Sequence, residues 1–303
     1  MKIAALYAFH CLDRGWSCPI SILNQFEKIG HQVSHFNLYM LDQSGKGVGY
    51  TDRGLLELID QQNDFEFCIL FDYGQFFSPL LANIDIPLIQ ESGDDIQAFQ
   101  QNVRKAPYAT YIITPDLRAF KKYRDMGYNA FHLPHWADPD IHYEREEVLQ
   151  NYFITTTIDE GRGNGVVPYM RRKLGELWND DRFFYGADYP KYMCKGHAVF
   201  QHSQFSEWTR RIPEACACKR LVFTDRIPEE TGIYNSYKDG IDIVYYRSWP
   251  EAVKKIKYYN NHLDEVAKIA ENGYNVTMAN HTSIIRAKQI LNLVECGDIN
   301  IEQ

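Results

Sequence analysis

The chain has 303 residues, of which 45% are hydrophobic and 24% charged, and its formal net charge is −8. This length suits two domains better than one core, and the composition is typical of a globular protein. No apolar run approaches the ~20 residues of a membrane-spanning helix. The N-terminal apolar run, interrupted by His10 and Asp13, is too short for a signal peptide. We therefore expect a cytoplasmic protein.

The charge and the cysteines exclude further classes. Residues 1–148 contain 12 Lys and Arg against 20 Asp and Glu, whereas the remainder contains 20 against 20. The acidic half is a poor electrostatic match for a nucleic-acid backbone, and the neutral half could hold a small anion. Seven scattered cysteines without a C-x-x-C pair predict reduced core thiols rather than a zinc site or a disulfide framework.

Strand-like and helix-like segments alternate through the first half of the chain. The strands are expected at residues 2–9, 31–38, 65–72, 86–93, 109–115 and within 129–138. The helices are expected at residues 17–30, 54–63, 94–106 and 116–127. Strict alternation of the two kinds of segment predicts parallel βαβ units.

The same pattern restarts after a polar stretch at residues 138–148. Strands are expected at residues 152–159, 182–188, 198–203, 220–225 and 242–248, and helices at 166–180, 249–272 and 282–295. We predict two doubly wound, Rossmann-like α/β domains, residues 1–145 and 146–280, that face each other across a cleft. Ligands of such sheets bind beyond the carboxyl ends of the strands.

Two adjacent arginines precede a proline in the segment FSEWTRRIPEACACKRLVFTD, residues 205–225. Pro213 suits the first position of a helix, so we expect a helix to begin there with Glu214 in its first turn. Arg210 and Arg211 would then lie beside the helix N-terminus, an arrangement that suits a diphosphate, and Glu214 would suit a ribose diol. A solvated arginine pair and a first-turn glutamate favoured by the helix dipole would explain the same pattern.

Residues 203–219, SQFSEWTRRIPEACACK, resemble the nucleotide-sugar signature of GT-B glycosyltransferases of the group 1 family. The likeness is greatest to the CgeB-like, spore-maturation branch, and it extends over about residues 150–295. The resemblance implies a GT-B fold in which residues 146–280 bind a nucleotide sugar, with UDP as the expected nucleotide. It also implies that residues 281–303 form a helix that crosses back to the first domain, and that sugar is transferred to a hydroxyl without a metal or other cofactor.

Two departures from the family signature are visible. Lys219 stands where the family has glycine, and Glu207 and Glu214 are seven positions apart rather than eight. If position 219 needs a left-handed backbone, lysine costs ~1–2 kcal/mol there.

The loop EGRGNG, residues 160–165, is a further candidate for phosphate binding. Its glycines would let backbone amides approach a phosphate, and its arginine could reach the same group, although a flexible loop explains the glycines equally well. Together with the signature, this loop completes the predicted donor-binding set, which is Arg162, Gly163, His202, Ser203, Arg210, Arg211 and Glu214.

Carboxylates at the end of a first-half strand are the candidate general bases. An inverting sugar transfer needs a base within hydrogen-bond reach of the acceptor hydroxyl. Within QESGDD we rank Asp94 first, Asp95 second and Glu91 third. A helix cap would equally explain Asp94. A retaining enzyme would not need this base, and the sequence does not distinguish the two outcomes.

Other polar and aromatic residues follow strands of the first half. His135 is a further candidate base, for which a structural role is the alternative, and His10, Asp13 and Trp16 are candidates for acceptor binding. The D-P-D motif at residues 138–140 lies at the domain junction rather than after a suitable strand, so we predict no metal.

The acceptor is left open by the sequence. A saccharide, a protein or a hydroxymethylated DNA base extruded from its duplex would each supply a hydroxyl. DNA would need a basic surface, for which the first half offers Arg104, Lys105, Arg118, Lys121, Lys122 and Arg124. A nucleotide-sugar-binding protein without activity and a nucleotide-sugar epimerase are the alternative functions.

Overall fold

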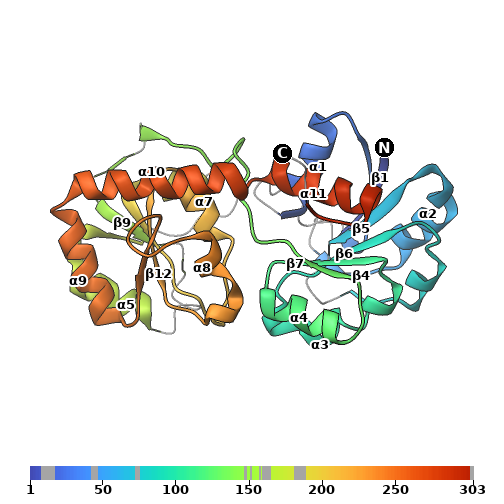
Figure 1. Cartoon of the computed structure of the whole chain (residues 1–303), viewed down its shortest axis with the longest axis horizontal. Coiled ribbons are helices and arrows are strands. Elements are labelled where there is room, and N and C mark those ends of the chain that lie inside the picture. Colours follow the sequence, from blue (N-terminus) through green and yellow to red (C-terminus); the bar gives the residue numbers. More distant parts are fainter. Residues whose placement is uncertain are drawn as a thin grey trace. The chain divides into compact units, whose positions relative to one another are not determined.

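The structure is a computed structural model that describes residues 1–7, 18–41, 47–71, 76–146, 149–150, 152–156, 158, 165–180 and 189–300. The chain forms two compact units, drawn in Figure 1. Unit 1 comprises Met1–Pro134 and Ile284–Gln303, and unit 2 comprises His135–Ser283. The segment from residue 135 to residue 145, which we expected in the first domain, therefore groups with unit 2.

Unit 1 contains a six-stranded sheet in the order β2-β1-β5-β6-β7-β8, and all its strand pairs are parallel. The strands are β1 (Lys2–Tyr7), β2 (Gln32–Asn37), β5 (Phe67–Phe71), β6 (Leu88–Glu91), β7 (Tyr111–Thr114) and β8 (Ala130–His132). Every residue of β5, FCILF, is buried, as expected for an inner strand with both faces covered. A short antiparallel pair, β3 (Tyr39–Leu41) and β4 (Gly47–Tyr50), lies apart from this sheet.

Helices of unit 1 connect these strands, as the alternation predicted. They are α1 (Cys18–Lys28), α2 (Arg53–Gln61), α3 (Asp95–Asn102), α4 (Leu117–Asp125) and α11 (Ser283–Cys296). At the start of α4, the Asp116 side chain accepts hydrogen bonds from the backbone N–H groups of Arg118 and Ala119, a capping role typical of aspartate. Most of α11 belongs to unit 1, where the Arg286 guanidinium donates to the Pro134 carbonyl at 2.8 Å.

Unit 2 contains a five-stranded parallel sheet in the order β10-β9-β11-β12-β13. Its strands are β9 (Tyr152–Thr156), β10 (Trp178–Asn179), β11 (Gly196–Phe200), β12 (Leu221–Asp225) and β13 (Val244–Tyr246). Residues 178–179 form an edge strand rather than the end of a helix, because α5 stops at Leu174 before Gly175, whose φ is 54°.

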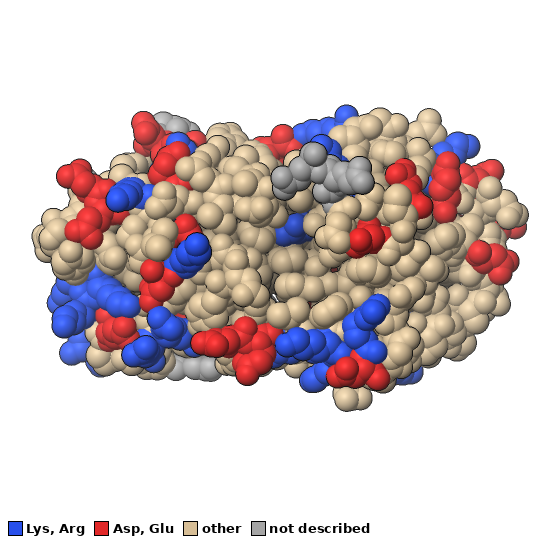
Figure 2. Space-filling view, in the orientation of Figure 1, with Lys and Arg blue, Asp and Glu red and all other residues tan. Residues whose placement is uncertain are grey.

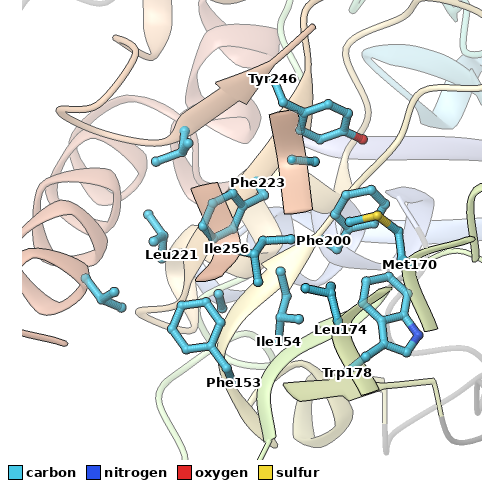
Figure 3. Packing of buried hydrophobic residues seen from close by; sticks show 14 of the residues in the cluster. Phe153, Ile154, Met170, Leu174, Trp178, Phe200, Leu221, Phe223, Tyr246 and Ile256 are labelled. Atoms are coloured by element: carbon cyan, nitrogen blue, oxygen red, sulfur yellow. The ribbon is translucent and has the colours of Figure 1, made fainter. Parts of the chain in front are cut away.

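The helices of unit 2 are α5 (Val166–Leu174), α6 (Tyr189–Met193), α7 (Arg211–Ala217), α8 (Ile233–Ser236), α9 (Trp249–Asn260) and α10 (Leu263–Asn280). The predicted helix of residues 249–272 is thus two helices. Gly273 of α10 permits close packing, because a Cβ there would lie 2.4 Å from the Asp242 carbonyl oxygen. The core between the sheet, α5 and α9 is shown in Figure 3, where Phe200, Phe223 and Ile256 pack together.

The predicted doubly wound α/β architecture is confirmed in both sheets. Cys68, Cys194, Cys216 and Cys218 are buried free thiols, and Cys296 is an exposed one, in agreement with the expectation of reduced cysteines. Among the residues that the structure describes, no helix combines the length and the apolar character that crossing a membrane requires.

Charged side chains form scattered groups on the face drawn in Figure 2, most of which consists of other residues. Lys and Arg gather over the part of unit 2 where Figure 1 draws α5 and α9, and the last turn of α5 carries Arg171, Arg172 and Lys173. The Arg171 guanidinium binds Asp180 at 2.7 Å. Because α5 follows β9, its last turn lies toward the amino end of the parallel sheet, away from the edge where ligands of such sheets bind.

Candidate functional site

The carboxyl edge of the unit 2 sheet gathers the signature residues that the structure describes. The strand order reverses between β9 and β11, and such a switch point is where doubly wound sheets bind ligands. His202 and Ser203 directly follow β11, and Asp225 ends β12. The arginine pair and Glu214 belong to α7 and its N-cap, in the connection between these two strands.

Helix α7 begins earlier than the sequence predicted. It runs from Arg211 to Ala217 with Arg210 at the N-cap, and Pro213 lies within the first turn. Proline is tolerated there because the first backbone N–H groups of a helix need no intrahelical partner. The earlier start places Arg210 and Glu214 one helical turn apart on the same face.

Glu214 is a buried carboxylate that is bound by its neighbours. It is 3% exposed, and its Oε1 atom lies 2.7 Å from Nε of Arg210. The Tyr189 hydroxyl of α6 also hydrogen bonds to it. Burial raises the pKa of Glu214 above its usual 4.5, and the charges of Arg210 and Arg211 oppose that rise. These contacts can therefore fix the two carboxylate oxygens of Glu214 in position, as the binding of a diol requires.

A second side chain, His142, reaches Glu214 from the segment before β9. Its Nε2 atom lies 3.6 Å from Oε1 of Glu214, and its side chain is fully buried. Burial, reinforced by Arg210 and Arg145, lowers the pKa of His142 to about 3, so the imidazole is neutral at physiological pH. Sequence reasoning missed His142 and Tyr189, because only the tertiary fold brings them to Glu214.

The two arginines of the pair differ in their surroundings. Arg210 is the ion-pair partner of Glu214, and its side chain is only 14% exposed. Arg211 is half-buried, and no ion pair joins it to another residue within the described part of the chain. Arg211 is thus the guanidinium that can offer its hydrogen-bond donors to an added anion.

His202 stacks on an aromatic residue at the same edge of the sheet. Its ring lies 6.3 Å from that of Tyr246, with 15° between the planes, and its Nδ1 atom lies 3.2 Å from the Tyr246 hydroxyl. The same Nδ1 atom is 3.6 Å from Oδ2 of Asp225. Burial raises the pKa of Asp225 and the neighbouring His202 opposes the rise.

Ser203 is held by the same carboxylate. Its backbone N–H donates to Oδ1 of Asp225 at 2.8 Å, and its hydroxyl oxygen accepts from the Glu207 N–H at 2.7 Å. These bonds fix the turn that follows β11. Glu207, the first glutamate of the signature, is partly exposed in that turn.

A pocket of about 390 Å³ opens at the ends of β11, β12 and β13, within the size range of small-molecule sites. Its lining combines three rings, a carboxylate, a hydroxyl and two guanidinium groups: His202, Tyr246, Trp249, Asp225, Ser248, Arg226 and Arg247, together with Pro250. Arg226 is already paired with Asp239 at 2.7 Å. The remaining polar groups could orient part of a bound molecule.

Lys219, at the signature's glycine position, has φ of 52°. The position therefore has the left-handed backbone that favours glycine. The lysine is anchored by Glu271, 3.0 Å from its Nζ atom, and by Glu144 at 3.8 Å.

In unit 1, the candidate base Asp95 is 3% exposed and accepts four side-chain hydrogen bonds. The donors are Ser92 at 2.6 Å, Asn102 at 2.9 Å, Thr114 at 2.6 Å and Tyr123 at 3.0 Å. Burial raises the pKa of Asp95 above its usual 3.8 and these donors oppose the rise. These hydrogen bonds hold Asp95 in place and fix the turn between β6 and α3.

Asp94, our first choice as base, has a different environment. It is exposed, its φ is 51°, and its side chain makes no capping hydrogen bond to α3 although it occupies the N-cap position. A left-handed backbone at a residue other than glycine is a strain that often marks a functional position. Glu91, the third choice, is buried, and His135 is partly exposed in unit 2.

The basic surface proposed for DNA does not form as one exposed face. Lys105 is buried, with Nζ 3.2 Å from Oδ1 of Asn102, and Arg118 is bound to Asp116 at 2.7 Å. Arg104 lies over the ring of Phe77 at 4.1 Å. Lys121, Lys122 and Arg124 are the members that are exposed on α4.

Several predicted site residues cannot be placed. His10, Asp13 and Trp16, predicted to bind the acceptor, and Arg162 and Gly163, predicted to bind the donor, lie outside the described residues. Asp138 of the D-P-D motif is buried, and its Oδ1 accepts from the Asp140 N–H at 3.1 Å. Among the described residues, no three or more His, Cys, Asp and Glu side chains gather as a metal site would require.

Comparison with known proteins identifies the family of the site-bearing region and the fold of the whole chain. Residues 165–292 match the family described as glycosyl transferase-like. No curated protein matches the chain by sequence.

Three solved structures illustrate the likeness of fold. Anabaena HepE, in complex with UDP and glucose, has a TM-score of 0.69 and 12% identity, over 97% of this chain and 99% of that one. Sucrose-phosphate synthase from Thermosynechococcus elongatus has a TM-score of 0.68 and 8% identity, over 97% and 98%. A glycosyltransferase from Rickettsia africae has a TM-score of 0.60 and 11% identity, over 97% of each chain.

These likenesses confirm the predicted GT-B fold with its two Rossmann-like domains and the resemblance to GT-B glycosyltransferases. Assignment to the CgeB-like branch stays a prediction. The chain therefore has the GT-B fold, and its residues 165–292 match the family described as glycosyl transferase-like.

Proposed function

We propose that this protein is a glycosyltransferase that moves a sugar from a UDP-linked donor to an acceptor hydroxyl, without a metal ion. One observation carries the proposal. The residues that match the glycosyl transferase-like family, 165–292, include the cluster of Arg210, Arg211 and Glu214 at the carboxyl edge of the unit 2 sheet. The structures of HepE with UDP-glucose and with UDP and glucose support the choice of UDP.

The donor would lie along the carboxyl edge of the unit 2 sheet. Glu214, held by Arg210, would accept hydrogen bonds from the ribose hydroxyls. Arg211 would bind the diphosphate and stabilise the charge that develops when the sugar bond breaks, as preorganised cations do. The pocket that His202 and Trp249 line would receive another part of the donor, because aromatic rings stack on sugars and bases.

The acceptor hydroxyl would be deprotonated by Asp94 if the reaction inverts the anomeric configuration. Asp94 suits this role better than Asp95, whose carboxylate already accepts four hydrogen bonds. The dispersed basic residues of unit 1 favour a saccharide or protein acceptor over DNA, which needs a continuous positive surface.

Calorimetric titration with UDP tests the donor site. We expect Arg211→Ala to weaken UDP binding about ten- to a hundredfold, since a hydrogen bond to a charged group contributes about 1.5–3 kcal/mol. Arg247→Ala, which removes an exposed arginine at the pocket rim, is the matched control and should have a smaller effect. Equal UDP affinity in the wild type and in a variant lacking both Arg210 and Arg211 would contradict the proposed site.

Product analysis by mass spectrometry tests the activity. UDP-sugars are incubated in the presence of a chelator with each candidate acceptor: saccharides, a protein and hydroxymethylated DNA. We expect the wild type to form a glycosylated saccharide or protein and Asp94→Asn to form no such product. UDP binding without any product would indicate a binding protein. An isomerised donor would indicate an epimerase, and glycosylated DNA would overturn the acceptor assignment. Activity that disappears with chelator would overturn metal independence.

A further inference from the structure

We propose that His142 is a positioning residue that holds the Glu214 carboxylate through its Nε2–H group and thereby sets the affinity of the site for the nucleotide. This inference rests on the proposed function of Glu214. It adds a residue from the segment before β9, outside the family match, to the machinery of the donor site.

The hydrogen bonds of His142 determine which of its nitrogens carries the proton. The backbone N–H of Asp138 lies 3.2 Å from Nδ1 and is directed at it as a donor. The Asp138 carbonyl oxygen accepts from the His142 backbone N–H at 2.7 Å and also lies 3.2 Å from Nδ1. A proton on Nδ1 would, however, face the Asp138 N–H that is directed at the same atom. Nδ1 is therefore the acceptor, and in a neutral imidazole the proton must then be on Nε2.

The Nε2–H group has Glu214 in front of it. Nε2 is buried and makes no hydrogen bond to any described residue, and Oε1 of Glu214 is 3.6 Å away. A buried donor without a partner is costly, and catalytic contacts often tighten when the ligand binds. When a ligand binds Arg210 or Arg211, a small shift of the Glu214 carboxylate toward His142 completes the hydrogen bond from Nε2–H to Oε1.

The neutral state of His142 makes it suited to this role. A charged histidine would compete with Arg210 for the carboxylate, whereas a neutral Nε2–H donates without adding charge to a buried cluster that already holds guanidinium groups. The charged and titratable groups that face Glu214 and His142 from the surrounding elements are Arg210, Arg211, Tyr189 and Arg145.

Nitrogen-15 NMR of the histidines in the wild-type protein tests the geometry without any substitution. We expect the resonances of His142 to be those of the neutral tautomer protonated at Nε2, unchanged between pH 8 and about pH 5. A proton on Nδ1, or titration within that range, would overturn the proposal.

A matched pair of substitutions tests the effect on the nucleotide. His142→Gln keeps an N–H donor close to the position of Nε2, whereas His142→Asn keeps one only near Nδ1. We expect His142→Asn to weaken UDP binding about tenfold and His142→Gln to restore affinity to within about threefold of the wild type. His197→Asn, at the opposite end of β11, is the control and should leave UDP binding unchanged.

The pH dependence of UDP binding separates positioning from a general packing role. Loss of the Nε2–H donor destabilises the buried carboxylate, so the pH at which UDP affinity falls on acidification should rise by about one unit in His142→Asn. Affinity that falls with no change in this midpoint would indicate packing alone and would overturn the inference.

A double-mutant cycle keeps the two proposals distinguishable. In a Glu214→Gln background, His142→Asn should cause no further loss of UDP affinity, because its partner is already changed. If Glu214→Gln itself leaves UDP affinity intact, the proposed donor site fails. If Glu214→Gln weakens binding and the two losses are additive, the role of His142 alone fails.

Discussion

Each unit of this molecule contains a carboxylate near the carboxyl edge of its sheet that is 3% exposed, and the two are stabilised differently. Asp95 of unit 1 is enclosed by neutral donors, two hydroxyls at 2.6 Å among them. Glu214 of unit 2 is bound by the Arg210 guanidinium at 2.7 Å and approached by the neutral His142. The amount of burial therefore does not distinguish the carboxylate that we propose as a ligand-binding group from the one with a structural role.

The two carboxylates, Asp95 and Glu214, differ in the nature of their hydrogen-bonding partners. The donors around Asp95 also contact one another and the backbone: the Ser92 and Tyr123 hydroxyls lie 2.9 Å apart, and Asn102 donates to the Gly93 carbonyl. That network is complete without a ligand. Around Glu214, the Nε2 atom of His142 has no hydrogen bond within the described structure, and Arg211 beside it has no ion-pair partner there. Incomplete polar groups of this kind are where a ligand gains most.

The largest expected effect follows from removing the enclosed carboxylate. Asp95→Ala should lower the free energy of unfolding by about 3–4 kcal/mol, because four buried donors lose their acceptor. Urea denaturation followed by circular dichroism measures this loss. Asp94→Ala, one residue earlier but exposed, is the control and should change stability by less than about 1 kcal/mol. Similar losses in the two variants would remove the contrast between Asp95 and its neighbour.

Sequence reasoning predicted the layers of the fold but not this contrast. Alternating apolar segments were sufficient to predict parallel strands in both units, because βαβ alternation permits few arrangements. In Asp94–Asp95, however, two identical side chains are adjacent, and only the left-handed backbone at Asp94 decides which one turns inward.

The same limit applies at the proposed donor site. Arg210 and Glu214 are four residues apart, a spacing that predicts their ion pair once the helix begins at Arg211, two residues earlier than expected. The sequence pattern instead indicates Pro213 as the first helical residue, although proline fits any position in the first turn. His142 gave no local signal, because it reaches Glu214 from 72 positions away through tertiary packing.

A change of pH should alter the free energy of unfolding by an intermediate amount. Burial raises the pKa of Asp95, so the folded state binds this proton more tightly than the unfolded state. The stability from this group is fully present below its unfolded pKa of about 3.9 and is lost as the pH rises through the higher, folded value. On acidification from pH 7 to pH 4, the free energy of unfolding of the wild type should therefore rise relative to that of Asp95→Asn. Parallel stability profiles of the two proteins, measured by denaturation at each pH, would show that Asp95 titrates as it does in the unfolded chain.

The smallest effect concerns two left-handed positions, one in each unit: Asp94 with φ of 51° and Lys219 with φ of 52°. Aspartate tolerates this backbone through its short polar side chain, whereas lysine bears the steric cost in full. Lys219→Gly relieves that strain but removes the ion pair with Glu271, and Lys219→Ala removes the ion pair while keeping the strain. We therefore expect the glycine variant to be more stable than the alanine variant by about 1 kcal/mol in thermal unfolding. The glycine and alanine variants at Asp94 should differ in stability by a similar amount. There, however, the glycine variant should be about as stable as the wild type, because aspartate already tolerates this backbone. If the Gly and Ala variants at position 219 unfold together, the left-handed backbone carries no cost, and the departure from the family's glycine is neutral for the fold.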